Sequence, residues 1–211
     1  MGLKFTPDLK WNSYILSVAK ETGMMVGSFF RTRNFLTPAA IHYLYKSQIR
    51  PRMEYCCHIW AGSPKCSLSC LDRVQRRMRW LIGDALFKTL QPLSHRRNVA
   101  SLSLLYWYYS GKCSKELHQL VPPPKVFGKD TRLAMHTKQN HPHTLEVPDS
   151  MKKCFHANSF FPRTVKLLNS LPSDCFPLSY NIDKFKKKVN QHLALSLVLI
   201  LLHILLSFIF C

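Results

Sequence analysis

Two cysteines and a histidine stand side by side in the stretch "YKSQIRPRMEYCCHIW", and two more cysteines follow at positions 66 and 70. These residue types are zinc ligands, and the spacing of Cys66 and Cys70 suits one half of a zinc site. Cys56, Cys57 and His58 are consecutive, however, so their side chains do not converge easily on one ion. No second close pair completes a ligand set, and the pattern favours free thiols, mostly buried, over a metal site. We predict no metal and no cofactor.

The sequence also lacks the arrangements that catalytic sites require. No serine lies in a G-x-S-x-G turn, and the glycines before Lys112 and Lys129 lack the upstream glycine of a phosphate-binding loop. Metal-assisted phosphoryl transfer needs carboxylates that converge on one or two ions. The 11 acidic residues are scattered, and no two of them are adjacent. We therefore predict no catalytic residues and no enzyme activity for this chain.

Arginine side chains give the strongest functional signal. The 30 lysines and arginines outnumber the acidic residues and give a formal charge of +19, which attracts nucleic acid or an anionic membrane surface. In "LSCLDRVQRRMRWLIGD", an apolar stripe at helical spacing lies opposite several arginines, so that guanidiniums could face phosphates. A solvated helix face accounts for this pattern equally well. The candidate nucleic-acid-binding residues are Arg73, Arg76, Arg77, Arg79, Arg96 and Arg97.

Helices must position most of these side chains. Apolar residues at helical spacing predict a first helix over 11–31. Thr37 is a good N-cap for a second helix, which Pro51 should end because it biases the residue before it away from helical dihedrals. Gly83 should end the arginine-bearing helix. Further helices are expected near 93–113, 161–171 and 182–193, and the four consecutive aromatic residues "YWYY" in the first of these favour a core over base stacking.

The predicted fold class is therefore mostly α, a helical bundle. We expect a helical region over 1–120, an irregular Pro/His-rich linker over 121–150, a helical extension over 151–192 and a hydrophobic tail over 193–211. No apolar signal segment opens the sequence, which indicates an intracellular protein with reduced cysteines.

The tail, Leu193–Cys211, carries no charged side chain and consists mainly of Leu, Ile, Val and Phe. As a helix it would be about 28 Å long, close to the ~30 Å of a bilayer's hydrocarbon core. Four lysines between positions 184 and 188 precede it. The tail is therefore predicted to be a transmembrane helix, through which the chain would contact a membrane.

Seven segments carry a resemblance to a known family. In order, they are "LKFTPDLKWNSYILSVAKETG", "LYKSQIRPRMEYCCHIWAGSPK", "LDRVQRRMRWLIGD", "HRRNVASLSLLYWYYSGKCSKEL", "PPP", "TRLA" and "FFPRTVKLLNSLPSDCFPLSYNIDKFKKKVNQHL". Together they resemble the C-terminal part of LINE-type (non-LTR) retrotransposon reverse transcriptases, over nearly all of residues 2–193. The resemblance implies a thumb-like region over 1–120 and a C-terminal extension over 151–192. It also implies that the arginines of 73–79 meet a nucleic-acid backbone.

The sequence departs from this family in several respects. The catalytic aspartates of the family's fingers and palm are absent, as is its endonuclease region, which implies a non-catalytic remnant. Leu168 stands where the family has tryptophan in R-x-x-x-L-W-N-S-L-P, and the apolar tail is not part of the family pattern. Three interpretations stay open. They are a remnant that binds the RNA or DNA backbone, a small basic tail-anchored membrane protein, and a reading frame without a functional product.

Overall fold

The computed structural model describes residues 2–8, 10–125, 142–146 and 158–209, with side chains as far as residue 195. This part of the chain is mostly helical and contains no strand beyond one isolated bridge, which confirms the predicted fold class. The chain divides into two compact units, Met1–Arg97 and Asn98–Cys211, which we describe separately. The finer division into regions at residues 120, 150 and 192 stays a prediction.

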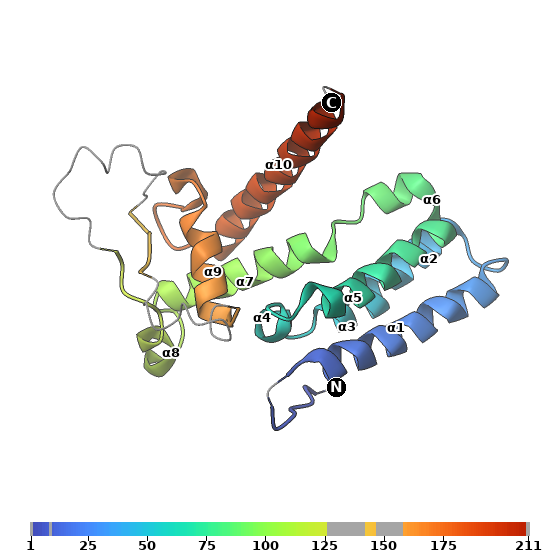
Figure 1. Cartoon of the computed structure of the whole chain (residues 1–211), viewed down its shortest axis with the longest axis horizontal. Coiled ribbons are helices and arrows are strands. Elements are labelled where there is room, and N and C mark those ends of the chain that lie inside the picture. The colour runs from blue at the N-terminus through green and yellow to red at the C-terminus, as the bar shows by residue number, and fades with distance from the viewer. Residues whose placement is uncertain (1, 9, 126–141, 147–157, 210–211) are drawn as a thin grey trace. The chain divides into compact units, whose positions relative to one another are not determined.

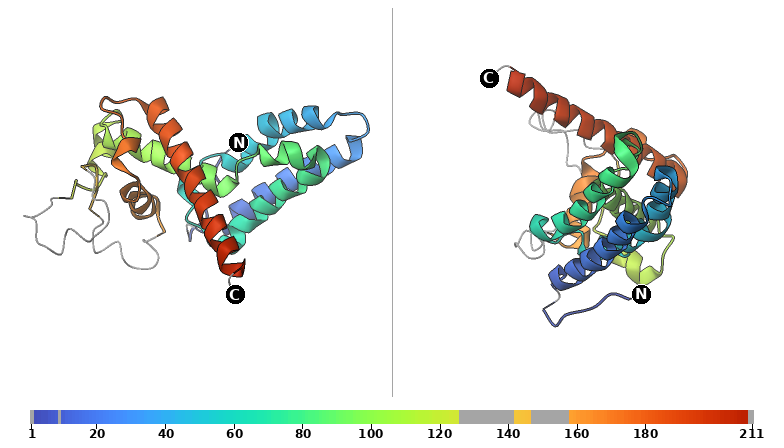
Figure 2. Two further views of the ribbon diagram at one scale, coloured as in Figure 1. Left: turned by 90° about the horizontal axis from the view of Figure 1, so that it is seen from above. Right: turned by 90° about the vertical axis from the view of Figure 1, so that its right-hand side faces the viewer.

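The first unit is built from helices that run back and forth along one direction (Figure 1). The chain follows α1, returns through α2 and α3, and runs forward again along α5; α1 and α5 lie side by side in Figures 1 and 2. Its elements are α1 (Asn12–Thr32), α2 (Pro38–Leu44), a π-helical turn (Tyr45–Ile49), α3 (Arg50–Glu54), α4 (Cys57–Trp60), α5 (Lys65–Arg77), α6 (Arg79–Lys88) and the first turns of α7 (Leu93–Tyr109).

Helix α1 forms where the apolar spacing predicted it. Ile15, Thr22 and Val26 are fully buried in the core of the first unit, and the Thr22 hydroxyl donates to the Val18 carbonyl at 2.6 Å. That bond satisfies the threonine hydroxyl within the helix, so Thr22 can pack among apolar side chains. The largest fully buried side chains of the unit are Trp60, Tyr45, Ile15, Ile41, Ile49, Met53, Leu71, Met78 and Leu93.

The second helix begins as predicted but does not end as predicted. The Thr37 side chain accepts from the Ala40 amide at 3.2 Å, and Pro38 occupies the first turn of α2. Pro51 was expected to stop the helix, but the chain passes through a π-helical turn and continues as α3 to Glu54. The prediction was wrong because the wider π turn gives room to a proline ring, which in a regular helix would clash with a carbonyl of the preceding turn.

The arginine-bearing segment forms two helices instead of one. Helix α5 ends at Arg77, and a tight turn at Met78, whose amide donates to the Gln75 carbonyl at 3.0 Å, leads into α6. Gly83 leaves helical geometry with φ 77° and ψ 167°, as expected for a helix-stopping glycine. Helical structure then resumes as far as Lys88, which the sequence pattern did not predict.

The second unit contains the rest of α7, followed by α8 (Lys115–Gln119), α9 (Phe160–Asn169), a 3₁₀ turn (Ser173–Cys175) and α10 (Ile182–Ile209). Its core centres on Tyr106, whose ring stacks on that of Phe185 with centroids 4.1 Å apart. The side chain of Asn169 pairs with both backbone groups of Leu145: Oδ1 accepts from its N–H at 3.0 Å, and Nδ2 donates to its carbonyl at 2.9 Å. The Asn169 side chain therefore forms with buried Leu145 the two hydrogen bonds that a neighbouring β-strand would otherwise form with its backbone.

Most of the predicted linker lies outside the described residues, and the predicted tail is described mainly by its backbone. The described ends of the predicted linker form one antiparallel bridge, between Pro124 and Leu145. The predicted tail continues α10 as helix to Ile209, but its side chains from residue 196 onward are not described. In the part that the structure describes, no helix is both long enough and apolar enough to span a membrane. The predicted transmembrane tail stays a prediction.

Candidate nucleic-acid interface

Helix α5 presents three arginines to solvent on the side opposite to its core contacts. Leu71 and Val74 are buried against the core of the first unit, where α5 packs on α1. Residues three and four apart share a helix face, so Arg73, Arg76 and Arg77 project together, and all three are exposed. None of the three forms an ion pair with any residue in the described ranges. We call these three residues the arginine face.

Arg79 is exposed as well, but its charge is compensated. Its guanidinium donates from Nε and Nη2 to the two carboxylate oxygens of Asp84, the Nη2–Oδ2 distance being 3.0 Å. These hydrogen bonds lower the pKa of the Asp84 carboxyl below its usual range. Arg79 therefore borders the arginine face as half of a surface ion pair, with less net charge to offer a phosphate.

Arg96 does not lie on this face, contrary to the expectation that grouped it with the surface arginines. It binds Glu54 in bidentate fashion, with Nη2 2.8 Å from Oε2, and this contact raises its pKa. Glu54 also lies 3.7 Å from the Arg50 guanidinium. Arg50 in turn donates to the Gln91 carbonyl at 3.3 Å, which also accepts from Gln75 at 3.0 Å. This polar cluster joins α3, α5 and the start of α7.

Arg97 lies in the interior and is only 4% exposed. Its Nη2 is 3.5 Å from a carboxylate oxygen of Asp72, and its guanidinium carbon lies 6.0 Å from the centroid of the Trp60 ring. The six predicted arginines thus divide into an outer group on α5 and α6 and a pair on α7 that binds carboxylates, of which Arg97 is buried and the Arg96 side chain is 37% exposed. We leave the pair on α7 out of the candidate interface because their guanidiniums already bind protein groups.

Trp80 belongs to the candidate interface although the sequence reasoning did not single it out. Its side chain is 83% exposed, the largest exposed fraction of the four tryptophans, and it follows Arg76 and Arg77 by four and three residues. Met78 between them keeps helical dihedrals, φ −61° and ψ −28°, so the helical spacing continues across the turn. The signal that could have found it is this spacing, because the buried positions 78, 81 and 82 leave position 80 on the outer side.

The cysteines form no comparable site. None of the described cysteines, Cys56, Cys57, Cys66, Cys70, Cys113 and Cys175, forms a disulfide with another, and no three metal-ligating side chains converge among the residues that the structure describes. Within this set only Cys57 and Cys175 are buried, so the expectation of mostly buried thiols was wrong. Cys56 adopts a left-handed backbone conformation, φ 49°, which is uncommon for a residue other than glycine. This conformation forms the turn that leads into α4.

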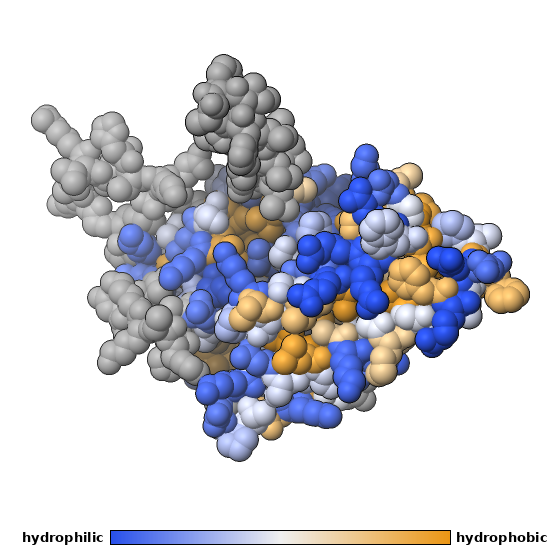
Figure 3. All heavy atoms as spheres, turned by 45° about the vertical axis from the view of Figure 1, so that its right-hand side comes forward, coloured by the Kyte–Doolittle hydropathy of each residue, from blue (hydrophilic) through white to orange (hydrophobic). Residues whose placement is uncertain are grey.

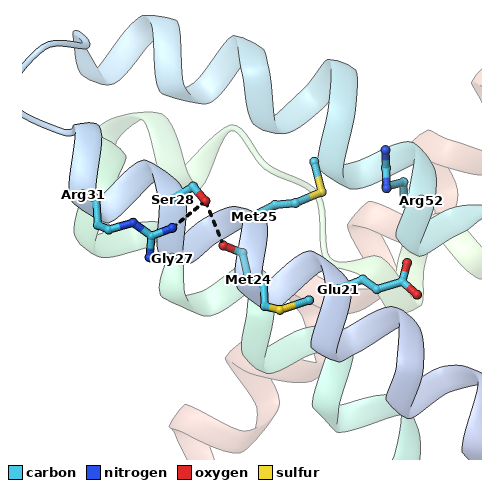
Figure 4. A pocket seen from close by; sticks show the side chains of 7 residues that line it. All are labelled: Glu21, Met24, Met25, Gly27, Ser28, Arg31 and Arg52. Atoms are coloured by element: carbon cyan, nitrogen blue, oxygen red, sulfur yellow. Dashed lines mark hydrogen bonds between the residues drawn. The ribbon is translucent and has the colours of Figure 1, made fainter.

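A groove on the first unit, of about 530 Å³, lies between α1 and α3 (Figure 4). Met24 and Met25 line its middle, with Arg31 at one end and Arg52 at the other. Arg31 donates to the Ser28 hydroxyl at 3.0 Å, which itself donates to the Met24 carbonyl, as the dashed lines in Figure 4 show. The groove combines methionine surface with mixed charge and brings together no set of groups that could perform chemistry.

Comparisons of the chain with protein-family models, with curated proteins and with solved structures find no match. Its function must therefore be inferred from the chemistry of its own residues. Hydrophobic side chains that reach the surface in Figure 3 are interrupted by hydrophilic ones. The arginine face places three exposed guanidiniums of one sign on a single helix, with no ion pair among the described residues, and this arrangement can bind phosphates.

Proposed function

We propose that this chain binds RNA or DNA through the phosphate backbone, using the arginine face of α5. The observation that carries the proposal is the uncompensated exposure of Arg73, Arg76 and Arg77 on one side of a helix whose other side is anchored in a core. Guanidiniums held in this way are suited to phosphates because they donate two parallel hydrogen bonds and are always charged.

The resemblance described above supports the proposal independently. We propose that the chain is a non-catalytic relative of the thumb and C-terminal extension of LINE-type reverse transcriptases. The thumb of that family holds a primer–template duplex, and its helices would have the same use for a row of arginines on an outer face. The motif R-x-x-x-L-W-N-S-L-P corresponds here to α9, in which Arg163 donates to the Ser101 hydroxyl at 3.2 Å and Asn169 holds Leu145. These contacts give the motif residues structural roles and leave phosphate binding to α5.

The test is a titration of labelled oligonucleotides with the full chain at several salt concentrations, read by fluorescence anisotropy. Each phosphate contact contributes about −0.9 to the slope of log K against log salt for duplex DNA, so three contacts give a slope of about −2.7. Affinity should then fall about 40-fold between 50 and 200 mM salt, by that relation. Absence of binding, or binding without a salt slope, would overturn the proposal.

A matched pair of variants assigns the binding to this face. Replacing Arg73, Arg76 and Arg77 by glutamine removes three positive charges from α5. Replacing Lys184, Lys186 and Lys187 by glutamine removes three from exposed positions of α10. We expect the α5 variant to lose most of the salt slope and the α10 variant to keep it. Equal losses would mean that overall charge, and not the arginine face, governs binding.

A further inference from the structure

We infer that Trp80 is a stacking platform for an unpaired base, so that the arginine face prefers single-stranded nucleic acid, or an unpaired end, over a closed duplex. This inference rests on the proposed function and adds the class of nucleic acid that the site takes. It starts from a tryptophan whose side chain is 83% exposed although the two residues that follow it, Leu81 and Ile82, are buried. No other ring in the described part of the chain packs against it.

Trp80, at the start of α6, lies on the same side as the arginine face of α5. Side chains three or four residues apart on a helix lie about 5–6 Å apart at their Cβ atoms. Arg73, Arg76 and Trp80 are spaced by three and four residues, and Arg73, Arg77 and Trp80 by four and three. The four side chains therefore share one side of α5 and the start of α6. Successive phosphates of a single strand also lie several ångströms apart, so guanidiniums along this side could hold a backbone while the indole meets a base.

The charges around Trp80 favour a nucleic acid as the occupant. This side carries three uncompensated guanidiniums, and the nearest acidic side chain on α6, Asp84, is bound to Arg79. An exposed aromatic ring beside uncompensated cations is the combination used by proteins that bind single strands, in which bases stack on the ring and cations follow the backbone. A second copy of this chain would bring the same positive side against itself, and like charges would oppose that contact.

Stacking is available only to a base that can leave its neighbours. In a closed duplex both faces of every internal base are covered, so Trp80 could meet only the terminal pair. The arginines, by contrast, can reach the phosphates of either a duplex or a single strand. Trp80 should therefore contribute to the affinity for single strands and very little to the affinity for duplexes, while the arginine face contributes to both.

The experiment compares two probes, a 15-nucleotide oligothymidylate and a blunt-ended duplex of 15 base pairs, at one salt concentration. Loss of one stacked base costs about 1–3 kcal/mol, so Trp80→Ala should weaken binding of the single strand about 5- to 150-fold. The affinity for the blunt duplex should change less than about twofold, and Trp80→Phe should keep most of the single-strand affinity because a phenyl ring also stacks. Phe35→Ala, which removes an aromatic side chain that is 88% exposed elsewhere on the first unit, is the matched control and should change neither affinity.

A second measurement follows Trp80 itself. Its emission should be quenched when the oligothymidylate binds, and the quenching should vanish in Trp80→Phe, because Trp60 is buried and Trp11 and Trp107 are only partly exposed. Circular dichroism of each variant checks that it folds, which a change at so exposed a side chain should not prevent.

The outcomes separate this inference from the proposed function. Binding of both probes with no effect of Trp80→Ala on the single strand would overturn the role of Trp80 and leave the arginine face intact. Failure of the parent chain to bind either probe would overturn both. Should Trp80→Ala instead abolish a self-association of the free protein in sedimentation, Trp80 belongs to a contact between copies and the inference is wrong.

Discussion

The guanidinium of Arg96 binds both carboxylate oxygens of Glu54, a residue 42 positions earlier in the sequence, with Nη2 2.8 Å from Oε2. Arg50 approaches the same carboxylate from within its own helix, at 3.7 Å. One carboxylate therefore contacts two arginines at the junction of α3 and α7 and offsets part of their positive charge. Without this carboxylate, the positive charges of Arg50 and Arg96 would repel each other and oppose the packing of the first unit.

We predict that Glu54→Gln destabilises the protein by about 2–4 kcal/mol, because it leaves two partly buried guanidiniums without their anion. The measurement is the urea midpoint followed by circular dichroism. Asp84→Asn is the matched control: it also breaks a bidentate pair with an arginine, Arg79, but at the surface, where such pairs contribute little. Equal midpoints for the two variants would show that the Glu54 cluster does not stabilise the interior.

We predict that Asn169→Asp lowers the free energy of unfolding by about 1–3 kcal/mol near neutral pH. A carboxylate cannot donate to the Leu145 carbonyl, which accepts a hydrogen bond from Nδ2 of Asn169. That carbonyl would also raise the pKa of the new carboxyl in the folded state. The new carboxyl would then bind a proton more tightly in the folded than in the unfolded variant. The difference in unfolding free energy between the variant and the parent should therefore shrink as the pH falls toward about 4. Asn169→Ala removes the same hydrogen bonds without a titrating group, and its difference from the parent should not change with pH.

The phenol of Tyr45 gives a prediction at alkaline pH. Burial raises its pKa far above the ordinary value, with the nearby Arg50 offsetting part of the rise. The unfolded chain therefore loses this proton first, and stability due to this group should fall as the pH rises above about 10. Tyr45→Phe removes the group, so its unfolding free energy should fall less steeply than that of the parent between pH 9 and 11, by the same linkage.

The control for Tyr45 is Tyr43→Phe, which removes a hydroxyl from a side chain that is 71% exposed. We expect its alkaline profile to follow that of the parent. Near neutral pH, Tyr45→Phe itself should shift stability by no more than about 1 kcal/mol, since only one neutral hydroxyl is lost. A Tyr45→Phe profile as steep as the parent's would mean that other groups control the alkaline transition.

The helices could be predicted from the sequence because helical spacing is a local property. The stripe of α5 is buried, that of α1 is buried or partly buried against the same core, and Thr37 caps α2 as its residue type suggested. The continuation past Pro51 could not be predicted, because it depends on a π-helical turn that no residue type specifies. Local pattern thus identified the elements better than their ends.

The candidate site was predictable only in part, for the same physical reason. Arg73, Arg76 and Arg77 lie opposite a local apolar stripe, so their exposure follows from spacing alone. The ion pairs of Arg96 and Arg97 depend on Glu54 and Asp72, which lie 42 and 25 residues away in the sequence. A pair of adjacent arginines gives no sign of such distant partners, so the sequence analysis offered to nucleic acid two charges that bind carboxylates of the protein.

The outer and inner arginines should respond in opposite ways to the same substitution. Arg76→Gln removes an exposed guanidinium that has no ion pair among the described residues, so stability should stay within about 0.5 kcal/mol of the parent. The slope of log K against log salt for duplex DNA should become shallower by about 0.9. Arg97→Gln removes a buried guanidinium that contacts Asp72 and the Trp60 ring, and should cost about 1–3 kcal/mol without changing that slope. Anisotropy titrations of both variants at matched folded fractions, with urea unfolding alongside, check the two effects. A shallower slope for Arg97→Gln, or an unchanged slope for Arg76→Gln, would mean that the division into an outer interface and a structural pair on α7 is wrong.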